Sequence, residues 1–366
     1  MKKSLSALLA LLLVSSLVFT GCSSSSSGGT SASTPSGSAS TSAPDASAEA
    51  EPEIVIKVAA EVADVQDRFE AIANRAFVDH LDSHPSIKVE FYPGAALGDQ
   101  TACYDQASRG QVDINIQQAS IVAGVDYPNF GIFDLPYTFN NMDGAVTVLD
   151  PDSPLSEALR EDYLAKTGMR LLTFTPNGFR NVTNNKREIR TPDDLKGIKL
   201  RTMSAPIQIA SWEAADVLVT PMAFTELYSA LQTGVVDGQE NPVAVILSNS
   251  FQEVQKYMTM SRHLLSVGSM VMYGDTYDKM TPDQQAHLEE SVRVYYESFC
   301  NGIKADDESM LKQIIDGNLM QVYEPTADEA AQFRAVMQPA ARTLIEDSIE
   351  DAKYLDLLLE EAAKYN

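Results

Sequence analysis

The sequence predicts an α/β fold, because short apolar runs with strand composition alternate with segments of helical periodicity. Strand-like runs occur at 53–61, 87–93 and 112–117. Between the first two, apolar residues from Phe69 to Leu81 recur every three or four positions, which indicates an amphipathic helix. Alternation of this kind is typical of a parallel sheet covered by helices.

The alternation continues through the second half of the chain. Thr191 begins a short helix that Gly197 ends, Thr281 begins a long helix, and Thr326 begins another with a capping box. Further strands are expected at 131–139, 170–176, 198–202, 217–222, 264–273 and 319–325. The folded part of about 310 residues is large for one core, so we expect two domains.

The first residues, MKKSLSALLALLLVSSLVFTGC, have the features of an export signal. Two lysines precede an apolar run that is too short to span a bilayer comfortably but suits a signal peptide. The run ends in Phe19-Thr20-Gly21-Cys22, which resembles a bacterial lipobox. We therefore expect residues 1–21 to be a lipoprotein signal peptide and Cys22 to carry the lipid that anchors the chain to the membrane. An ordinary signal peptide with an incidental cysteine is the alternative.

Residues 22–52 are rich in Ser, Gly and Ala and contain no aromatic or branched aliphatic side chain. Such a segment cannot bury enough apolar surface to offset its ordering entropy, so it is expected to be a disordered tether. The formal charge of the whole chain is −24, which argues against nucleic acid and against electrostatic binding to anionic lipid. Cys103 and Cys300 have no spacing that pairs them, so buried thiols are expected rather than a disulfide.

The stretch LQTGVVDGQENP, residues 231–242, combines breakers with polar side chains. Gly234 is expected to end a helix in a left-handed conformation, with a minimal strand at 235–236, a turn at Gly238 and a new helix opened by Asn241 and Pro242. Ligands of open α/β sheets bind outside the carboxyl ends of strands, and this stretch would deliver polar side chains to such an edge. A capped turn that faces water is the alternative.

Several phrases resemble the solute-binding proteins of tripartite ATP-independent periplasmic (TRAP) transporters, the DctP family. They are MAFTELYSALQTGVVDGQENPVAVILSNSFQEVQKYMTMSRH, NGFRNVTNN, TPDDLKGIKLRTM, FGIFDLPYTF and EFYPGAALGD, and the resemblance covers roughly residues 53 to 350. It implies a two-domain periplasmic-binding-protein-like fold of type II, with a cleft between lobes, crossing hinge strands and a long helix. The implied lobes are 53–176 plus 267–305 and 177–266 plus 306–366.

The resemblance also assigns residues that contact the substrate. Arg201 of KLRT matches the arginine that binds the substrate carboxylate, and Arg180 of GFR matches a second arginine that contacts or supports the ligand. Asn241 and Phe224 match an asparagine and an aromatic residue of the site. Independently, Arg201 lies in a predicted buried strand, where an arginine requires a partner and its planar fork suits a carboxylate. A structural ion pair is the alternative for Arg201, and a core position is the alternative for Phe224.

Two positions depart from the family pattern. Many relatives carry a histidine near the end of the first strand, where this chain has Glu61. A carboxylate there would repel an anion unless it binds a hydroxyl or an amine. Gln118, at the end of the third strand, is a candidate neutral hydrogen-bonding residue, with surface exposure as the alternative. Both residues favour a polar, hydroxylated acid over a simple dicarboxylate.

No pattern in the sequence indicates catalysis, a metal site or a cofactor. The four histidines form no HExxH motif, and the chain lacks a GxSxG elbow, a P-loop and a GxGxxG motif. His80 and His84 have helical i, i+4 spacing, but a core or helix-end role is favoured over metal. Trp212 is expected to fill a helix–sheet interface. The resemblance implies an extracytoplasmic lipoprotein that captures a small organic acid and delivers it to the small and large TRAP permease subunits. Presentation of ligand to a sensor kinase or chemoreceptor, and a cell-surface enzyme on the same fold, are the alternatives.

Overall fold

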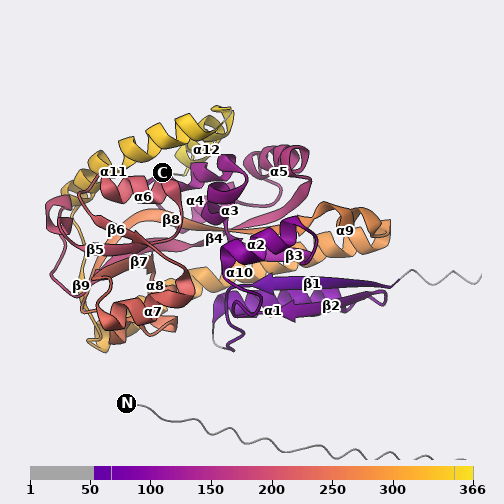
Figure 1. Cartoon of the computed structure of the whole chain (residues 1–366), viewed down its shortest axis with the longest axis horizontal. Helices are drawn as coiled ribbons and strands as arrows, with labels where there is room; N and C mark the ends of the chain where they lie inside the picture. The colour runs from indigo at the N-terminus through magenta and orange to yellow at the C-terminus, as the bar shows by residue number, and fades with distance from the viewer. Residues whose placement is uncertain (1–52, 67, 350, 366) are drawn as a thin grey trace, which may run out of the picture. The chain divides into compact units, whose positions relative to one another are not determined.

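The structure of the chain, a computed structural model, describes residues 53–366 apart from 67, 350 and 366 (Figure 1). The predicted signal peptide, the tether and Cys22 lie outside these residues. The strands are β1 Ile54–Ala60, β2 Ile87–Tyr92, β3 Ile114–Gln118, β4 Met169–Asn184, β5 Lys199–Thr202, β6 Leu218–Pro221, β7 Gly238–Pro242, β8 Tyr257–Tyr273 and β9 Gln321–Tyr323. They form one nine-stranded sheet in the order β2-β1-β3-β8-β4-β7-β5-β6, with β9 beside β8.

Two long antiparallel strands, β4 and β8, connect the whole sheet. Strand β8 pairs with β3 through Gly268–Met272 and with β9 through Tyr257–Thr259, while β4 pairs with β7 through Arg180–Asn184. The sequence predicted only 170–176 and 264–273 as strands. Strand β4 continues past Pro176 because a register shift between Pro176 and Phe179 accommodates the proline without breaking the pairing.

The sheet is mixed, so the prediction of a parallel sheet is wrong for its centre. Strands β1, β2 and β3 are parallel to one another, as are β5, β6 and β7, which agrees with the strand–helix alternation. The pairs β3–β8, β4–β8 and β4–β7 are antiparallel. The difference arises because β4 and β8 lie between the two parallel groups.

The α-helices are α1 Phe69–Asp82, α2 Gln100–Ser108, α3 Ala119–Val125, α4 Met142–Val148, α5 Pro154–Thr167, α6 Pro206–Glu213, α7 Phe224–Thr233, α8 Val243–Ser248, α9 Gly274–Lys279, α10 Pro282–Asp316, α11 Ala327–Ser348 and α12 Lys353–Ala363. The predicted long helix is α10, which begins at a capping box on Thr281 and contacts α1, β4 and α8 (Figure 1). Edge-to-face ring contacts of Phe69 with Phe299 and of Phe77 with Tyr295 attach α10 to α1. No helix in the described part of the chain has the length and apolar composition to cross a membrane.

Some local predictions were wrong. The stretch 131–139 is not a strand, because a 3-10 helix, η1, occupies Pro128–Asp134. Val235 and Val236 form no strand, and Gly238 begins β7 instead of turning the chain. Any side chain at Gly238 would meet the backbone oxygen of Thr183, so glycine permits the close pairing of β7 with β4.

Other local predictions are confirmed. Gly234 ends α7 in the left-handed conformation, with φ 74°. Cys103 and Cys300 are buried free thiols, and Trp212 is buried in a cluster with Leu200 and Phe333. His80 of α1 hydrogen-bonds to Ser291 of α10, and His84, two residues after α1, hydrogen-bonds to Asp283 of α10. The lobe boundaries given above stay a prediction.

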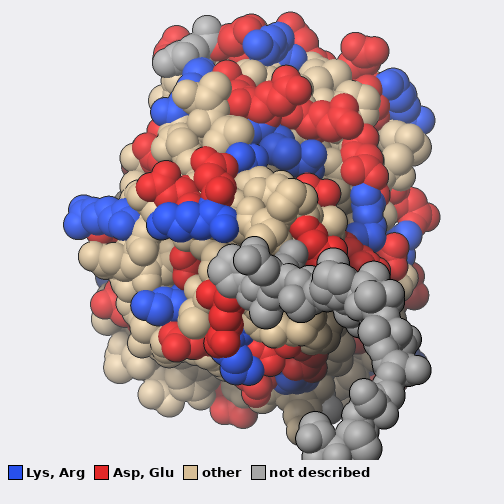
Figure 2. Space-filling model, turned by 90° about the vertical axis from the view of Figure 1, so that its right-hand side faces the viewer, with Lys and Arg blue, Asp and Glu red and all other residues tan. Residues whose placement is uncertain are grey.

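The face of the molecule on the α9 side carries acidic and basic side chains next to one another (Figure 2). With 51 acidic and 27 basic residues in the whole chain, most cations can find an acidic partner. A buried cation without one is therefore the unusual observation in this protein.

Candidate functional site

A cavity of about 290 Å³ lies where the two parallel groups of strands face each other, and all six predicted ligand contacts line it. Glu61 directly follows β1, Gln118 ends β3, Arg180 lies on β4, and Arg201 lies on β5. Asn241 of β7 and Phe224, the first residue of α7, complete the set. Except for Arg180 and Phe224, these residues lie at or next to the carboxyl ends of strands, where ligands of α/β sheets bind.

Arg201 is a buried cation without an acidic partner among the described residues. Its side chain is 2% exposed, and its Nε and Nη2 donate to the carbonyl of Met222 at 3.1 and 2.7 Å. Its Nη1 is buried and has no hydrogen-bond partner in the described chain. Burial lowers the pKa of Arg201 to about 10. Since an unpaired buried donor is costly, this geometry favours an anion beside Nη1 over the alternative of an internal ion pair.

Arg180 has the partner that Arg201 lacks. Its Nε and Nη2 donate to the Glu240 carboxylate at 2.5 and 2.7 Å, and Nη2 also donates to the Glu240 carbonyl at 2.6 Å. The remaining nitrogen, Nη1, donates to Ser266 Oγ at 3.2 Å. Burial alone would raise the pKa of Glu240, but Arg180 outweighs it and lowers the pKa to about 2. The charge of Arg180 is thus neutralised within the protein.

A histidine extends this pair away from the cavity. His263 Nε2 lies 3.2 Å from Glu240 Oε2, and Ser261 Oγ lies 2.9 Å from His263 Nδ1. Burial lowers the pKa of His263, so its neutral ring donates from Nε2 to the carboxylate. The ring of Trp212 packs edge-on against His263 at 4.8 Å. These contacts fix the orientation of Glu240 and, through it, of Arg180.

Neutral amides occupy another part of the wall. Gln118 accepts from Ser266 Oγ at 2.8 Å through its side-chain oxygen, and Asn177 accepts from Thr175 Oγ1 and from the Gly268 amide. Neither side-chain nitrogen has a hydrogen-bond partner among the described residues, so both can donate to a ligand. Asn241 donates to Gln239 Oε1 at 2.5 Å, which leaves its own oxygen as an acceptor.

Glu61 is an acidic residue of the cavity wall whose charge interacts with Arg201. Its Oε2 accepts from Gln100 Nε2 at 2.5 Å, and the same glutamine accepts from the backbone amide of Gln118 at 2.8 Å. Burial raises the pKa of Glu61 to about 7, against the opposing effects of Arg201 and Arg68. Near neutral pH, Glu61 therefore exists in both charged and neutral forms.

The ring of Phe224 contacts both Arg201 and the adjoining hydrophobic core. Its ring centroid lies 5.9 Å from Cζ of Arg201 and 6.0 Å from the ring of Phe251 in the adjoining core. The ring therefore covers the arginine on one side and packs on the core on the other.

Several polar residues of the cavity wall were not predicted as ligand contacts from the sequence. They are Arg68, Gln100, Asn177, Thr225, Asn249 and Ser266. The sequence signal for Asn177 was the glycine that follows it, because Gly178 has a φ of 99° and lies within the register shift of β4 between Pro176 and Phe179. Arg68 forms an ion pair with Glu70 at 3.1 Å, so it adds no free charge to the site.

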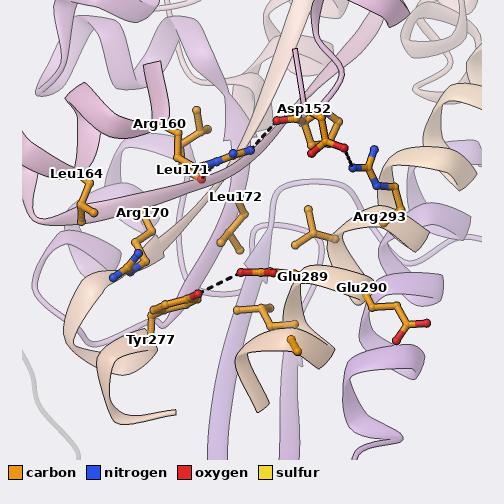
Figure 3. A pocket seen from close by; sticks show the side chains of 14 residues that line it. Asp152, Arg160, Leu164, Arg170, Leu171, Leu172, Tyr277, Glu289, Glu290 and Arg293 are labelled. Carbon is orange, nitrogen blue, oxygen red and sulfur yellow. Dashed lines mark hydrogen bonds and ion pairs between the residues drawn. The ribbon is translucent and has the colours of Figure 1, made fainter. Parts of the chain in front are cut away.

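A second cavity, of about 620 Å³, is larger but contains none of the predicted residues (Figure 3). Two of its arginines, Arg170 and Arg293, form ion pairs with exposed or half-exposed aspartates. None of its three arginines is buried as Arg201 is. We therefore take the cavity around Arg201 as the functional site. The described residues contain no group of three or more His, Cys, Asp or Glu side chains that could hold a metal ion.

Comparison with known proteins identifies the family of the chain. The chain matches the family "Bacterial extracellular solute-binding protein, family 7" (DctP) over residues 79–347. It is 30% identical to the C4-dicarboxylate-binding periplasmic protein DctP of Rhodobacter capsulatus, over 79% of this chain and 86% of that protein. It is also 30% identical to the 2,3-diketo-L-gulonate-binding periplasmic protein YiaO of Escherichia coli, over 67% and 73% of the two chains.

A solved structure has the same fold. The sugar acid binding protein DctPAm of Advenella mimigardefordensis, in complex with galactonate, superposes with a TM-score of 0.79 at 29% identity, over 86% of this chain and 99% of that one. The family consists of solute-binding proteins and not of enzymes, and the periplasmic-binding-protein fold with its long helix α10 is as predicted. This chain belongs to family 7 of the bacterial extracellular solute-binding proteins, the DctP family of TRAP transporters.

Proposed function

We propose that this protein captures a hydroxylated monocarboxylate in the cavity around Arg201 and delivers it to the membrane subunits of a TRAP transporter. The observation that carries the proposal is the buried Nη1 of Arg201, which has neither a carboxylate nor another acceptor among the described residues. A ligand carboxylate would supply that acceptor and the missing negative charge.

The charges around the cavity support one carboxylate per ligand. Of the three arginines in the wall, Arg68 is paired with Glu70 and Arg180 with Glu240, so Arg201 alone has an uncompensated charge. A dicarboxylate would place its second charge against amides or near Glu61. The amide groups of Gln118, Asn177 and Asn241 suit hydroxyl groups instead, because they both donate and accept.

The volume of the cavity and the ligands named for two relatives also support a small hydroxylated acid as the ligand. A cavity of about 290 Å³ lies at the lower end of the range for ligand pockets, roughly 300 to 1,000 Å³, so a small ligand is expected. Relatives named for galactonate and for 2,3-diketo-L-gulonate bind sugar acids. The relative named for C4-dicarboxylates represents the competing ligand class.

The proposal that the ligand is delivered to a permease rests on the family and on the sequence of residues 1–52. We propose that Cys22 carries lipid, that residues 22–52 form the tether, and that the small and large permease subunits receive the ligand. The permease subunits lie in the same membrane as the lipid on Cys22. The tether would therefore keep the binding protein close to them.

A thermal-unfolding screen tests the ligand class. Galactonate, erythronate and succinate would each be added to the purified protein, since a ligand at 100 times its Kd stabilises the native state by about 2.7 kcal/mol. We expect the two hydroxy acids to raise Tm and succinate to have little effect. If succinate alone raised Tm, the monocarboxylate assignment would be wrong, and if no organic acid did so, the capture function itself would fail. Uptake by proteoliposomes that contain the permease subunits then tests delivery.

A further inference from the structure

The cavity in Figure 3 lies apart from the solute site, between α5, the start of β4, α9 and α10. Its volume of about 620 Å³ falls within the range of pockets that bury small ligands. It shares no lining residue with the cavity around Arg201. Any ligand that it holds would therefore contact none of the residues that line the cavity around Arg201.

A bulge in β4 gives this cavity an apolar floor. Leu172 lines the cavity with a half-buried side chain, whereas the side chain of Leu171 is 1% exposed and packs in a hydrophobic core, so Leu171 contributes its backbone. The register of β4 against β8 shifts between Leu171 and Thr173, so Leu172 is the extra residue of a bulge and turns toward the cavity. Leu164 of α5 and Val292 of α10 extend the same surface.

One arginine at the rim has no acidic partner. Arg160 of α5 donates to the carbonyls of Pro151 and Leu171 at 2.9 and 3.3 Å, and no described carboxylate lies within ion-pair distance of it. By contrast, Arg293 is paired with Asp150 and with Asp152. The charge of Arg160 is thus available to an anion in the cavity.

A second arginine contributes an unused donor on the same side. Arg170 lies over the ring of Tyr277, with Cζ 3.9 Å from the centroid, and its Nη2 pairs with Asp278 at 2.9 Å. Its Nε is buried and has no hydrogen-bond partner among the described residues. The acidic Glu289 lies beyond Leu172 as seen from Arg160, and accepts from Tyr277 (Figure 3). The cavity is therefore basic on the side of α5 and β4 and apolar across its floor.

We propose that this cavity is a second binding site, for an amphipathic carboxylate whose charged end lies between Arg160 and Arg170 and whose apolar body covers Leu164 and Leu172. The whole chain is strongly acidic and repels anions at long range, so recognition must come from these short-range groups. An apolar body adds burial that a small sugar acid cannot provide. The site therefore selects a different ligand class from the solute cavity.

A chain-length series of butanoate, hexanoate and octanoate tests the site by calorimetry on the full chain. We expect octanoate to bind with one-to-one stoichiometry and affinity to rise about fourfold for each added methylene. Arg160→Gln should weaken octanoate binding at least tenfold, and Leu172→Trp should abolish it by filling the cavity. Arg109→Gln, at an exposed arginine of the chain, is the matched control and should bind like the wild type.

Arg201→Lys separates the two cavities. Octanoate binding that survives this change but is weakened by Arg160→Gln supports the second site. No octanoate binding, binding lost with Arg201→Lys, or binding unaffected by Arg160→Gln would each overturn it. If Leu172→Trp does not fold, Arg160→Gln still decides, because a half-exposed arginine can be replaced without leaving a cavity. None of these outcomes depends on whether the protein captures sugar acids.

Discussion

Arg180 and Glu240 form a buried bidentate ion pair at the wall of the solute cavity, with Nε 2.5 Å from Oε2 and side chains 2% and 0% exposed. The neighbouring Arg201 has no such partner among the described residues. Arg180 on β4 and Arg201 on β5 therefore differ in whether their charge is compensated within the protein. Arg180 shapes the cavity as a neutral pair, while Arg201 has no ion pair among the described residues.

Glu240→Gln should destabilise the protein strongly, because it leaves the Arg180 charge buried without a counterion. Breaking a buried pair in this way costs about 3 to 5 kcal/mol. Urea unfolding at pH 7 would measure the loss, with Glu226→Gln at an exposed position of α7 as control. The pKa of Glu240 is lowered to about 2, so its stabilising contribution is present above the ordinary pKa near 4.5 and is lost as the pH falls toward 2. Equal stability of both variants at pH 7 would refute a structural role for the pair.

Arg201→Lys should weaken ligand binding about tenfold, or about 1.4 kcal/mol, without changing the fold. Lysine keeps the charge but cannot both donate to the Met222 carbonyl and present a planar fork to a carboxylate. Calorimetry with galactonate would measure the change, and Arg342→Lys, at an exposed site on α11, serves as control. An unchanged affinity would remove Arg201 from the binding site.

Cys22→Ala should release the protein from the membrane. We expect the wild type to incorporate labelled palmitate and to sediment with membranes, and the variant to do neither, because the apolar run alone is too short to span a bilayer. Cys103→Ala removes a buried thiol and should leave the label in place. Label that persists in Cys22→Ala would show that the lipid is elsewhere.

The sequence predicted which residues line one cavity better than it predicted the sheet. Periodicity and capping residues located most helices, and Arg201 could be recognised because a charged side chain interrupts a buried strand. Strand β4 was predicted too short because Pro176 and Gly178 resemble a strand end, and only the pairing with β8 makes them a bulge. Long-range pairing of this kind has no local signature.

The sequence also could not predict which charged side chains form ion pairs with one another. Arg180 and Glu240 are 60 residues apart, and the register of β4 with β7 brings them together. The residues next to Arg180 and Arg201 in the sequence do not indicate that the charge of Arg180 is neutralised while that of Arg201 is not. The same limit applies to Glu61, whose environment depends on Gln100 and on Arg201 from distant elements.

Ligand affinity should fall as the pH rises above about 7, because Glu61 changes charge in that range. Burial raises the pKa of Glu61 to about 7, so below that value it is mostly neutral and can donate to a ligand, whereas above it the carboxylate repels an anion. The charged groups that face Glu61 are Arg201, Arg68 and Asp99. Anion binding next to the Glu61 carboxyl disfavours its charged form further, so the complex should take up a proton.

Calorimetry with galactonate at pH 6, 7 and 8, in two buffers of different ionisation enthalpy, measures both effects. We expect the affinity at pH 8 to be several-fold below that at pH 6, with an apparent proton uptake that is largest near pH 8. Glu61→Gln keeps the hydrogen-bonding shape without the titration, so its affinity should be nearly independent of pH over this range. A wild-type affinity that is equally flat, while galactonate still binds, would show that Glu61 stays in one charge state and would leave the capture function intact. The pH dependence therefore tests the role of Glu61 separately from that of Arg201.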